Sequence, residues 1–146
     1  MPKLSFDRQV PFSPQQMLGL VADLESYPDF VPNCSSMKVM RDSGQSADVR
    51  MARMAVRFGP IKQAYTSRVT IDPTDHTIDA TAVDGPFSHL DSTWQFTPEG
   101  DHTRVRFDID FGISNPLIAA IAEPAFAAKQ DEILDAFMAE AARRYA

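Results

Sequence analysis

The chain has little cysteine, no long apolar run and no excess of positive charge, and each shortage excludes a class of protein. Cys34 is its one cysteine, so an internal disulfide is impossible, and we expect a small buried side chain in a reducing compartment. No apolar stretch approaches the ~18 residues of a membrane span, and residues 1–10 lack the apolar core of a signal peptide. We therefore expect a cytoplasmic protein, with at most peripheral contact with the inner membrane.

Positive charge is also scarce. The chain has 14 Lys and Arg against 20 Asp and Glu, which gives a formal net charge of −6 at pH 7. Because phosphate contact depends mainly on Lys and Arg, no DNA partner is expected. The three histidines show no metal-ligand spacing, and no nucleophile–base pattern stands out. The sequence thus predicts no catalytic residues, no metal site and no catalytic cofactor.

What the chain does contain is a series of strand and helix signals that fits one domain over residues 1–146. A strand over residues 3–10 precedes Ser13-Pro14-Gln15-Gln16, a capping-box sequence with proline at the first helical position. We expect that helix to end at Pro28, with a short turn or second helix over residues 29–33.

Strand signals then continue to residue 113. The expected strands cover residues 36–41, 47–58, 61–71, 77–83, 90–97 and 103–113, with short turn sequences between them. Connections this short imply antiparallel pairing. In the last strand one face carries Val105, Phe107, Ile109 and Phe111, whereas the inward face of residues 47–58 stays undecided.

A long helix ends the chain. We expect it to start at Asn115-Pro116 and to reach about Tyr145, with a kink or break near Ile121 because Pro124 removes a helical hydrogen bond. An antiparallel sheet of this length needs cover on its apolar face, and this helix is the available cover. The predicted fold class is therefore α+β, with about seven antiparallel strands curled around the C-terminal helix and a gap between them lined by Tyr65, Val69, Trp94 and Phe107.

Two aromatic–proline segments bracket the strands. They are Tyr27-Pro28-Asp29-Phe30-Val31-Pro32-Asn33-Cys34 and Gly85-Pro86-Phe87. Proline restricts its own φ and that of the preceding residue, so the neighbouring aromatic rings are held in set directions. Two interpretations are open for these rings: gates at a ligand entrance, or caps on the core. The helix stripe that includes Ile121 and Phe126 is likewise either core or a movable lid.

These segments, with Thr66-Ser67-Arg68-Val69 and with Leu90, Trp94 and Phe96 behind the second, resemble the coenzyme Q-binding branch of the START-domain, or helix-grip, superfamily over essentially the whole chain. That branch holds ubiquinone-binding proteins of respiratory membranes and ribosome-association toxins of the RatA type. The resemblance implies a START/Bet v 1-like fold and a lipid-quinone ligand, ubiquinone. Asn33 departs from the pattern, since the ubiquinone-binding members often carry tryptophan there.

The expected function is non-enzymatic binding of ubiquinone in the cavity, in support of its transfer or use in respiratory electron transport. The alternative is a toxin that blocks ribosomal subunit association, with the ribosome as partner; Asn33 favours it and the acidic charge opposes it. A cyclase-type enzyme ranks last, because the assigned cavity faces offer mainly Tyr65 and Ser67 or Ser92. The expected ligand-binding residues are Tyr27, Phe30, Tyr65, Val69, Phe87, Leu90, Trp94, Phe107, Ile121 and Phe126.

A second segment, the tip of an expected hairpin, is a candidate for contact with a membrane. The hairpin tip at Gly59-Pro60 carries Phe58 and Ile61 beside Arg57 and Lys62, and could enter a bilayer interface. The competing interpretation is a turn whose apolar residues pack inward.

Overall fold

The computed structural model describes residues 3–32, 34–40, 49–58, 61–85 and 87–145. These residues form seven strands, a short 3-10 helix and three α-helices. In chain order they are β1 (Lys3–Val10), α1 (Pro14–Ala22), η1 (Leu24–Ser26), α2 (Tyr27–Phe30), β2 (Cys34–Met40), β3 (Val49–Phe58), β4 (Ile61–Asp72), β5 (Thr77–Asp84), β6 (Phe87–Glu99), β7 (His102–Ile113) and α3 (Pro116–Tyr145). The α+β class and the long C-terminal helix are confirmed.

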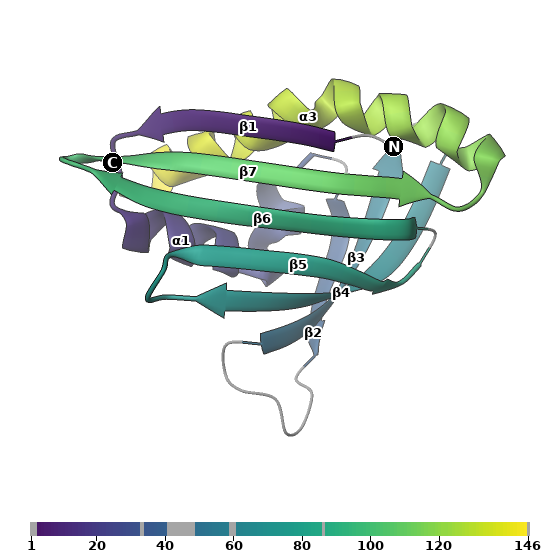
Figure 1. The fold of residues 1–146 in the computed structure, drawn as a ribbon, viewed down its shortest axis with the longest axis horizontal. Coiled ribbons are helices and arrows are strands. Elements are labelled where there is room, and N and C mark those ends of the chain that lie inside the picture. The colour runs from purple at the N-terminus through teal and green to yellow at the C-terminus, as the bar shows by residue number, and fades with distance from the viewer. Residues whose placement is uncertain (1–2, 33, 41–48, 59–60, 86, 146) are drawn as a thin grey trace.

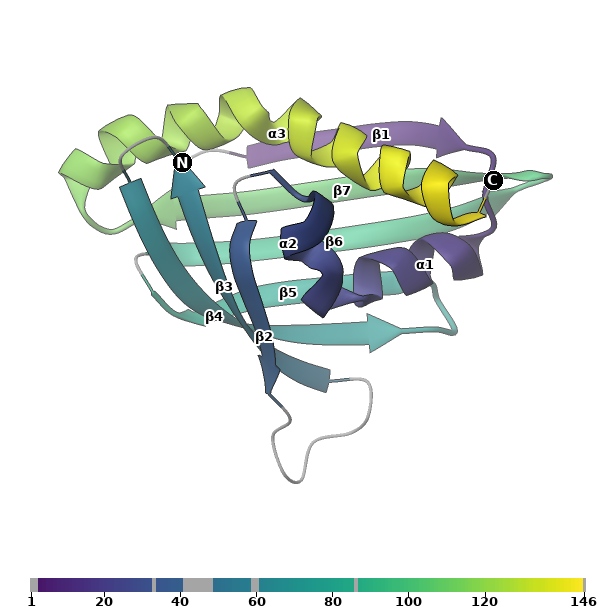
Figure 2. The same ribbon diagram turned by 180° about the vertical axis from the view of Figure 1, so that it is seen from behind.

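All seven strands belong to one antiparallel sheet in the order β1-β7-β6-β5-β4-β3-β2. From β2 to β7 each strand pairs with its neighbour in sequence, and β1 pairs with β7, where Phe6 lies opposite Phe107. The sheet is strongly curled: β3 and β4 run in a markedly different direction from β6 and β7, and α3 crosses the concave side (Figures 1 and 2). The expected helix-grip arrangement is therefore confirmed.

The first helix begins as its capping sequence predicts and ends earlier than expected. The Ser13 hydroxyl accepts a hydrogen bond from the Gln16 backbone N–H at 3.0 Å, and the Gln16 side chain accepts one from the Ser13 N–H at 3.0 Å. The expectation that Pro28 ends this helix is wrong, because α1 already ends at Ala22. Pro28 instead lies in the first turn of α2, where a missing N–H breaks no helical hydrogen bond.

The start of α3 is fixed to the end of β7. The Asn115 side chain accepts hydrogen bonds from the N–H groups of Leu117 and Ile118 at 2.9 and 3.3 Å, as the expected N-cap. The Glu123 carboxylate accepts one from the Ile113 N–H at 3.0 Å, which ties the second turn of the helix to the strand. The helix continues through Pro124 to Tyr145, so no break occurs near Ile121.

The C-terminal half of α3 is fixed by charge. Arg144 donates to Glu140 on its own helix at 2.7 Å and to Asp23, which precedes η1, at 3.0 Å. Arg143 also donates to Glu140, whose side chain is only 8% exposed. Hydrogen bonds from Arg143 and Arg144 lower the pKa of Glu140 to about 2 despite its burial. Arg8 on β1 donates to Asp135 at 2.5 Å, which adds a link to the edge of the sheet.

One hydrophobic cluster joins the concave face of the sheet to α1 and α3. Its most buried members are Met17, Leu20 and Val21 on α1, Phe96, Val105 and Phe111 on the sheet, and Leu134 and Ala141 on α3. The α3 members all come from the C-terminal part of the helix. Packing between the helix and the sheet is therefore dense at that end.

Candidate functional site

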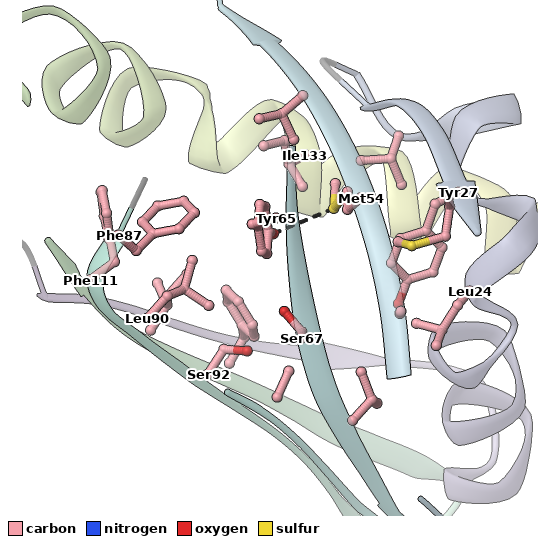
Figure 3. A pocket seen from close by; sticks show the side chains of 18 of the residues that line it. Leu24, Tyr27, Met54, Tyr65, Ser67, Phe87, Leu90, Ser92, Phe111 and Ile133 are labelled. Atoms are coloured by element: carbon pink, nitrogen blue, oxygen red, sulfur yellow. Dashed lines mark hydrogen bonds between the residues drawn. The ribbon is translucent and has the colours of Figure 1, made fainter. Parts of the chain in front are cut away.

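A partly open cavity of about 190 Å³ lies between the concave face of the sheet and α3 (Figure 3). Its wall is almost entirely apolar, and none of the described residues that line it carries a formal charge. All the strands from β2 to β7 contribute to the wall, together with η1, α2 and α3. A pocket with this lining suits an uncharged, largely apolar ligand.

The wall near β4 depends on one glycine. Gly85 adopts a φ of +113°, and a Cβ added there would lie 2.5 Å from the Cβ of Tyr65 and 3.2 Å from the Ala64 carbonyl oxygen. Only glycine combines that backbone conformation with so close an approach. The turn that it permits brings the ring of Phe87 edge-on to the ring of Tyr65, with centroids 4.9 Å apart.

A β-bulge lies beside the same turn. The register between β4 and β5 shifts at Thr66 and Ser67, and the Asp84 carboxylate accepts a hydrogen bond from the Thr66 N–H at 2.7 Å. Arg53 on β3 donates to the Thr66 hydroxyl at 3.2 Å. Bulges re-aim the side chains beside them, and these contacts fix the section of β4 that presents Tyr65 and Ser67 to the cavity.

Aromatic rings form the opposite wall. Phe137 of α3 lies 5.1 Å from both Tyr27 and Trp94, edge-on to each, and Trp94 lies 4.5 Å from Phe107. The Tyr27 hydroxyl donates to the Val21 carbonyl, so its polar end is already satisfied by the protein. Burial raises the pKa of Tyr27, which keeps the phenol protonated. This wall is therefore fixed and offers the cavity little besides ring surface.

The polar groups of the cavity are few. They come from Gln63, Tyr65 and Ser67 on β4 and from Ser92 on β6. Burial raises the pKa of Tyr65 to about 12, so its hydroxyl stays a neutral donor. The acceptor of that hydroxyl is the Met54 sulfur at 3.4 Å, a weak partner (Figure 3).

Seven of the ten sequence-predicted residues line this cavity: Tyr27, Tyr65, Val69, Phe87, Leu90, Trp94 and Phe107. Phe30 does not. Its ring packs on Phe137 at 5.3 Å and borders a shallow outer groove between α2 and α3. Ile121 is 56% exposed and also lies outside the lining, where Ile118 and Ala122 take its place. The side chain of Phe126 lies outside the described part of the structure.

Other lining residues escaped the sequence analysis. On β3, where the inward face was left undecided, Ala52, Met54 and Val56 point to the cavity. Their alternation is visible in the sequence, but Met51 and Ala55 make the opposite face apolar too. The cavity lining also includes residues of β5 and α3 that the sequence did not single out: Ile78, Ala80, Ile133, Leu134 and Phe137.

One partly exposed section of the cavity wall lies where the β3–β4 hairpin approaches α3. Val56 and Gln63, which pair across the hairpin, are half-buried, as are Ile118 and Ile133 on the helix. Beside them the outer surface of α3 is apolar, with Leu117 79% and Ile121 56% exposed. We call Leu117, Ala120, Ile121, Pro124, Ala127 and Ala128, all exposed and spaced at helical intervals, the apolar stripe of α3. The hairpin tip at Gly59-Pro60 lies outside the described residues.

One serine, histidine and aspartate lie together outside the cavity. His89 lies 2.9 Å from Asp110 and 3.5 Å from the Ser88 hydroxyl, but Ser88 is exposed and none of the three lines the cavity. Burial raises the pKa of Cys34 to about 11, so its thiol is a poor nucleophile at neutral pH. Neither group is placed to act on a molecule in the cavity.

A curled antiparallel sheet closed by a C-terminal helix over an apolar cavity defines the START-like class of proteins. The chain belongs to the family described as polyketide cyclase / dehydrase and lipid transport, whose model matches residues 10–138. The resemblance inferred from the aromatic–proline segments is thereby confirmed. In the described residues no helix is long and apolar enough to cross a membrane.

Named relatives divide between two functions. The chain is 32% identical to the ribosome association toxin RatA of Escherichia coli K12, over 99% of this chain and 90% of the toxin. It is 31% identical to the mitochondrial coenzyme Q-binding protein COQ10 homolog B of Xenopus laevis, over 92% of this chain and 55% of that protein.

Solved structures agree on the fold. The 18 kDa protein CC1736 of Caulobacter crescentus is 30% identical, with a TM-score of 0.79 over 98% of this chain and 97% of that chain. The Zhui aromatase/cyclase of Streptomyces sp. R1128 has a TM-score of 0.86 over 99% and 96% of the two chains, at 17% identity. At that identity the likeness to the cyclase concerns the fold alone.

Proposed function

We propose that residues 1–146 act as one lipid-binding domain whose cavity holds the head group of a lipid quinone, ubiquinone, and that the protein supports transfer or use of that quinone in respiratory electron transport. The observation that carries the proposal is the lining of the cavity: aromatic and aliphatic side chains with few neutral polar ones and, among the described residues, no charged one. A substituted quinone ring is flat, apolar over its faces and neutral, with carbonyl oxygens at its edge. Such a ring matches this lining.

The volume of the cavity limits which part of a lipid quinone it can enclose. At about 190 Å³ it is smaller than the roughly 300 Å³ at which pockets begin to enclose drug-sized ligands. A ring fits, whereas a long isoprenoid tail does not. The tail therefore leaves through the partly exposed section between the β3–β4 hairpin and α3, and passes beside Ile118 and the apolar stripe.

That exit supports peripheral contact with a bilayer. The apolar stripe of α3 lies next to the exit, and Arg57 and Lys62, opposite each other on the hairpin, are exposed. An apolar helix face with basic residues nearby suits the interface of an anionic membrane. Docking there lets the quinone tail pass between cavity and bilayer with little of its length in water.

Binding rather than catalysis follows from the same lining. Cyclase chemistry needs an acid or base that reaches the substrate. The described lining offers hydroxyl, amide and thioether groups, and Tyr65, the most acidic hydroxyl-bearing candidate, has a pKa of about 12. We therefore propose a protein that carries or presents its ligand unchanged.

The test is direct binding. Trp94, the single tryptophan of the chain, lines the cavity and serves as its fluorophore. Titration with a short-tail ubiquinone should quench its emission to a stoichiometry of one per chain, and organic extraction of protein purified from its own cell should yield quinone by mass spectrometry. Absence of both signals would refute the proposal.

A matched pair of phenylalanines provides the control. Phe87 and Phe30 are both half-buried, but only Phe87 lines the cavity. Phe87→Ala should weaken quinone binding about tenfold, since it removes most of one contacting ring, whereas Phe30→Ala should leave affinity within twofold. Thermal melts of both variants establish that the loss belongs to the ligand and not to folding.

The second candidate is ribosome association. It is favoured by the 32% identity to RatA over nearly the whole chain and by Asn33, where the quinone-binding members often carry tryptophan. Overproduction of such a toxin should slow growth and shift sucrose-gradient profiles from whole ribosomes toward subunits. A quinone binder should leave those profiles unchanged, and its deletion should lower respiration until short-tail quinone is added.

A further inference from the structure

Two serines lie on either side of β5 on the floor of the cavity, staggered by two residues along the strands. Ser67 lies on β4 and Ser92 on β6, and both hydroxyl oxygens point into the space between these strands (Figure 3). The strand between them, β5, carries Ala82 opposite Ser67 and Ala80 opposite Ser92. Because alanine side chains are short, the serine hydroxyls on β4 and β6 project further into the cavity than the side chains of β5 between them.

The separation between Ser67 and Ser92 suits a ring-shaped ligand. Strands two apart in a sheet are separated by roughly 9–10 Å between backbones. The stagger of two residues makes the line between Ser67 and Ser92 a diagonal, and the inward reach of both side chains leaves a gap that a flat six-membered ring with an oxygen at each of two opposite edges can bridge. A ring lying over Ala80 and Ala82 thus meets a hydroxyl at each of two edges.

Both hydroxyls lack a partner within the part of the chain that the structure describes. Neither Ser67 nor Ser92 makes a side-chain hydrogen bond there, although Ser67 is only 7% exposed. An enclosed hydroxyl without a partner destabilises the folded protein, whereas alanine at either position would be free of that penalty. Serines at these places are explained if a bound molecule supplies the missing acceptor.

Tyr65 is a third hydrogen-bond donor beside Ser67 and Ser92. It lies two residues before Ser67 on the same face of β4, and its hydroxyl has only the Met54 sulfur as acceptor. A phenol that stays protonated is a better donor than serine, and its present partner is weak enough to be exchanged for a carbonyl oxygen. With no charged residue in the described lining, these donors select a neutral acceptor over a carboxylate or phosphate.

We propose that Ser67 and Ser92, assisted by Tyr65, form a subsite that binds the oxygen atoms of a neutral ring carbonyl compound and distinguishes it from a plain hydrocarbon ring of the same shape. This rests on the proposed function, because it names the part of the quinone that the protein recognises. The apolar wall supplies general affinity for lipid, and the subsite supplies the choice among lipids.

The experiment compares two ligands in four proteins. Decyl-substituted benzoquinone and decylbenzene share a ring and a tail, and only the first has carbonyl oxygens. Competition against a fluorescent fatty probe measures both in wild type, Ser67→Ala, Ser92→Ala and the control Ser88→Ala, an exposed serine on the same strand as Ser92. Wild type should prefer the quinone by at least tenfold, and each cavity variant should lose about five- to tenfold for the quinone alone.

The outcomes separate the two proposals. If wild type binds neither ligand, both the quinone function and the subsite are wrong. If wild type binds both but Ser67→Ala and Ser92→Ala leave the preference unchanged, the subsite is wrong and the lipid-binding cavity stands. Melting temperatures give an independent readout: removal of an unpartnered hydroxyl should leave the unliganded variants as stable as wild type or more so. A clear fall in melting temperature for both cavity variants would assign the serines to folding and overturn the subsite.

Discussion

The two halves of α3 are both regular helix, but they differ in the side chains that they expose and bury. Between Pro116 and Ala128 the sequence has one charged residue, Glu123, and its outward side is the apolar stripe. Between Asp131 and Tyr145 there are four acidic residues and two arginines, and the inward side chains of Leu134, Phe137 and Ala141 are buried. One half is thus apolar on its outer side. The other is charged on its outer side and buried on its inner side, where Leu134 and Phe137 also reach the cavity wall.

This difference indicates that the two halves of α3 have separate roles. Burial and ion pairing at the C-terminal half hold the helix to the sheet and so maintain the fold. The N-terminal half contributes Ile118 and Ala122 to the cavity wall and leaves Leu117 and Ile121 in solvent, where they stabilise nothing inside the molecule. The membrane contact proposed above would account for exposed leucine and isoleucine at helical spacing.

The largest expected effect concerns stability and uses two leucines of the same helix. Leu134→Ala, at a fully buried position, should lower the free energy of unfolding by about 3 kcal/mol, within the range of 2–5 for such truncations. Leu117→Ala, at a position 79% exposed, should change it by less than about 0.5 kcal/mol. Urea denaturation of both variants measures this, and equal losses would show that the halves do not differ as described.

An intermediate effect concerns the charge cluster at Glu140. Its pKa of about 2 in the folded protein lies below that of an unfolded glutamate, about 4.3, so its contribution to stability is present above about pH 4.3 and is lost as the pH falls toward 2. Glu140→Gln should therefore cost about 2 kcal/mol at pH 7 and progressively less in acid.

The readout for Glu140 is the difference in unfolding free energy between wild type and variant at pH 7, 4 and 3. Asp131→Asn, an exposed carboxylate on the same half of the helix, is the control and should give a small difference at pH 7. A Glu140→Gln penalty that stays constant with pH would contradict the role given to its ionised form.

The smallest expected effect concerns membrane contact. Leu117→Glu combined with Ile121→Glu should lower partitioning onto phosphatidylglycerol vesicles about tenfold, because two apolar side chains no longer enter the interface. Gln15→Glu combined with Ala142→Glu adds the same charge at exposed positions away from the stripe and is the control. Vesicle sedimentation measures both pairs, and an equal loss in the control would assign the effect to charge alone.

Much of the fold was readable because particular positions obey strong local rules. The alternation in β7 predicted the inward face correctly, and Val105, Phe107, Ile109 and Phe111 are all buried. The capping sequences at Ser13 and Asn115 predicted both helix starts. Pro28 misled because proline is compatible with the first turn of a new helix as well as with the end of an old one.

The site was less predictable because several faces are apolar on both sides. Leu117, Ile118, Ile121 and Ala122 form one continuous apolar arc of α3, so the helical period could not tell that Ile118 and Ala122 face the cavity while Ile121 faces solvent. The direction of Phe30 depends on α2, whose position was not foreseen. No local rule reveals that Ser67 and Ser92 lie on one floor, since that depends on the order of three strands.

The attachments of α3 also determine how it can move. Glu123 and Asn115 fasten its beginning near Ile113, and Arg144 and Asp135 fasten its end to Asp23 and Arg8. Pro124, which cannot complete a helical hydrogen bond, lies just inside the first fastening. Each end of α3 is thus bonded to a different part of the molecule, so the helix cannot leave the sheet as a rigid body unless one of these two sets of contacts is broken.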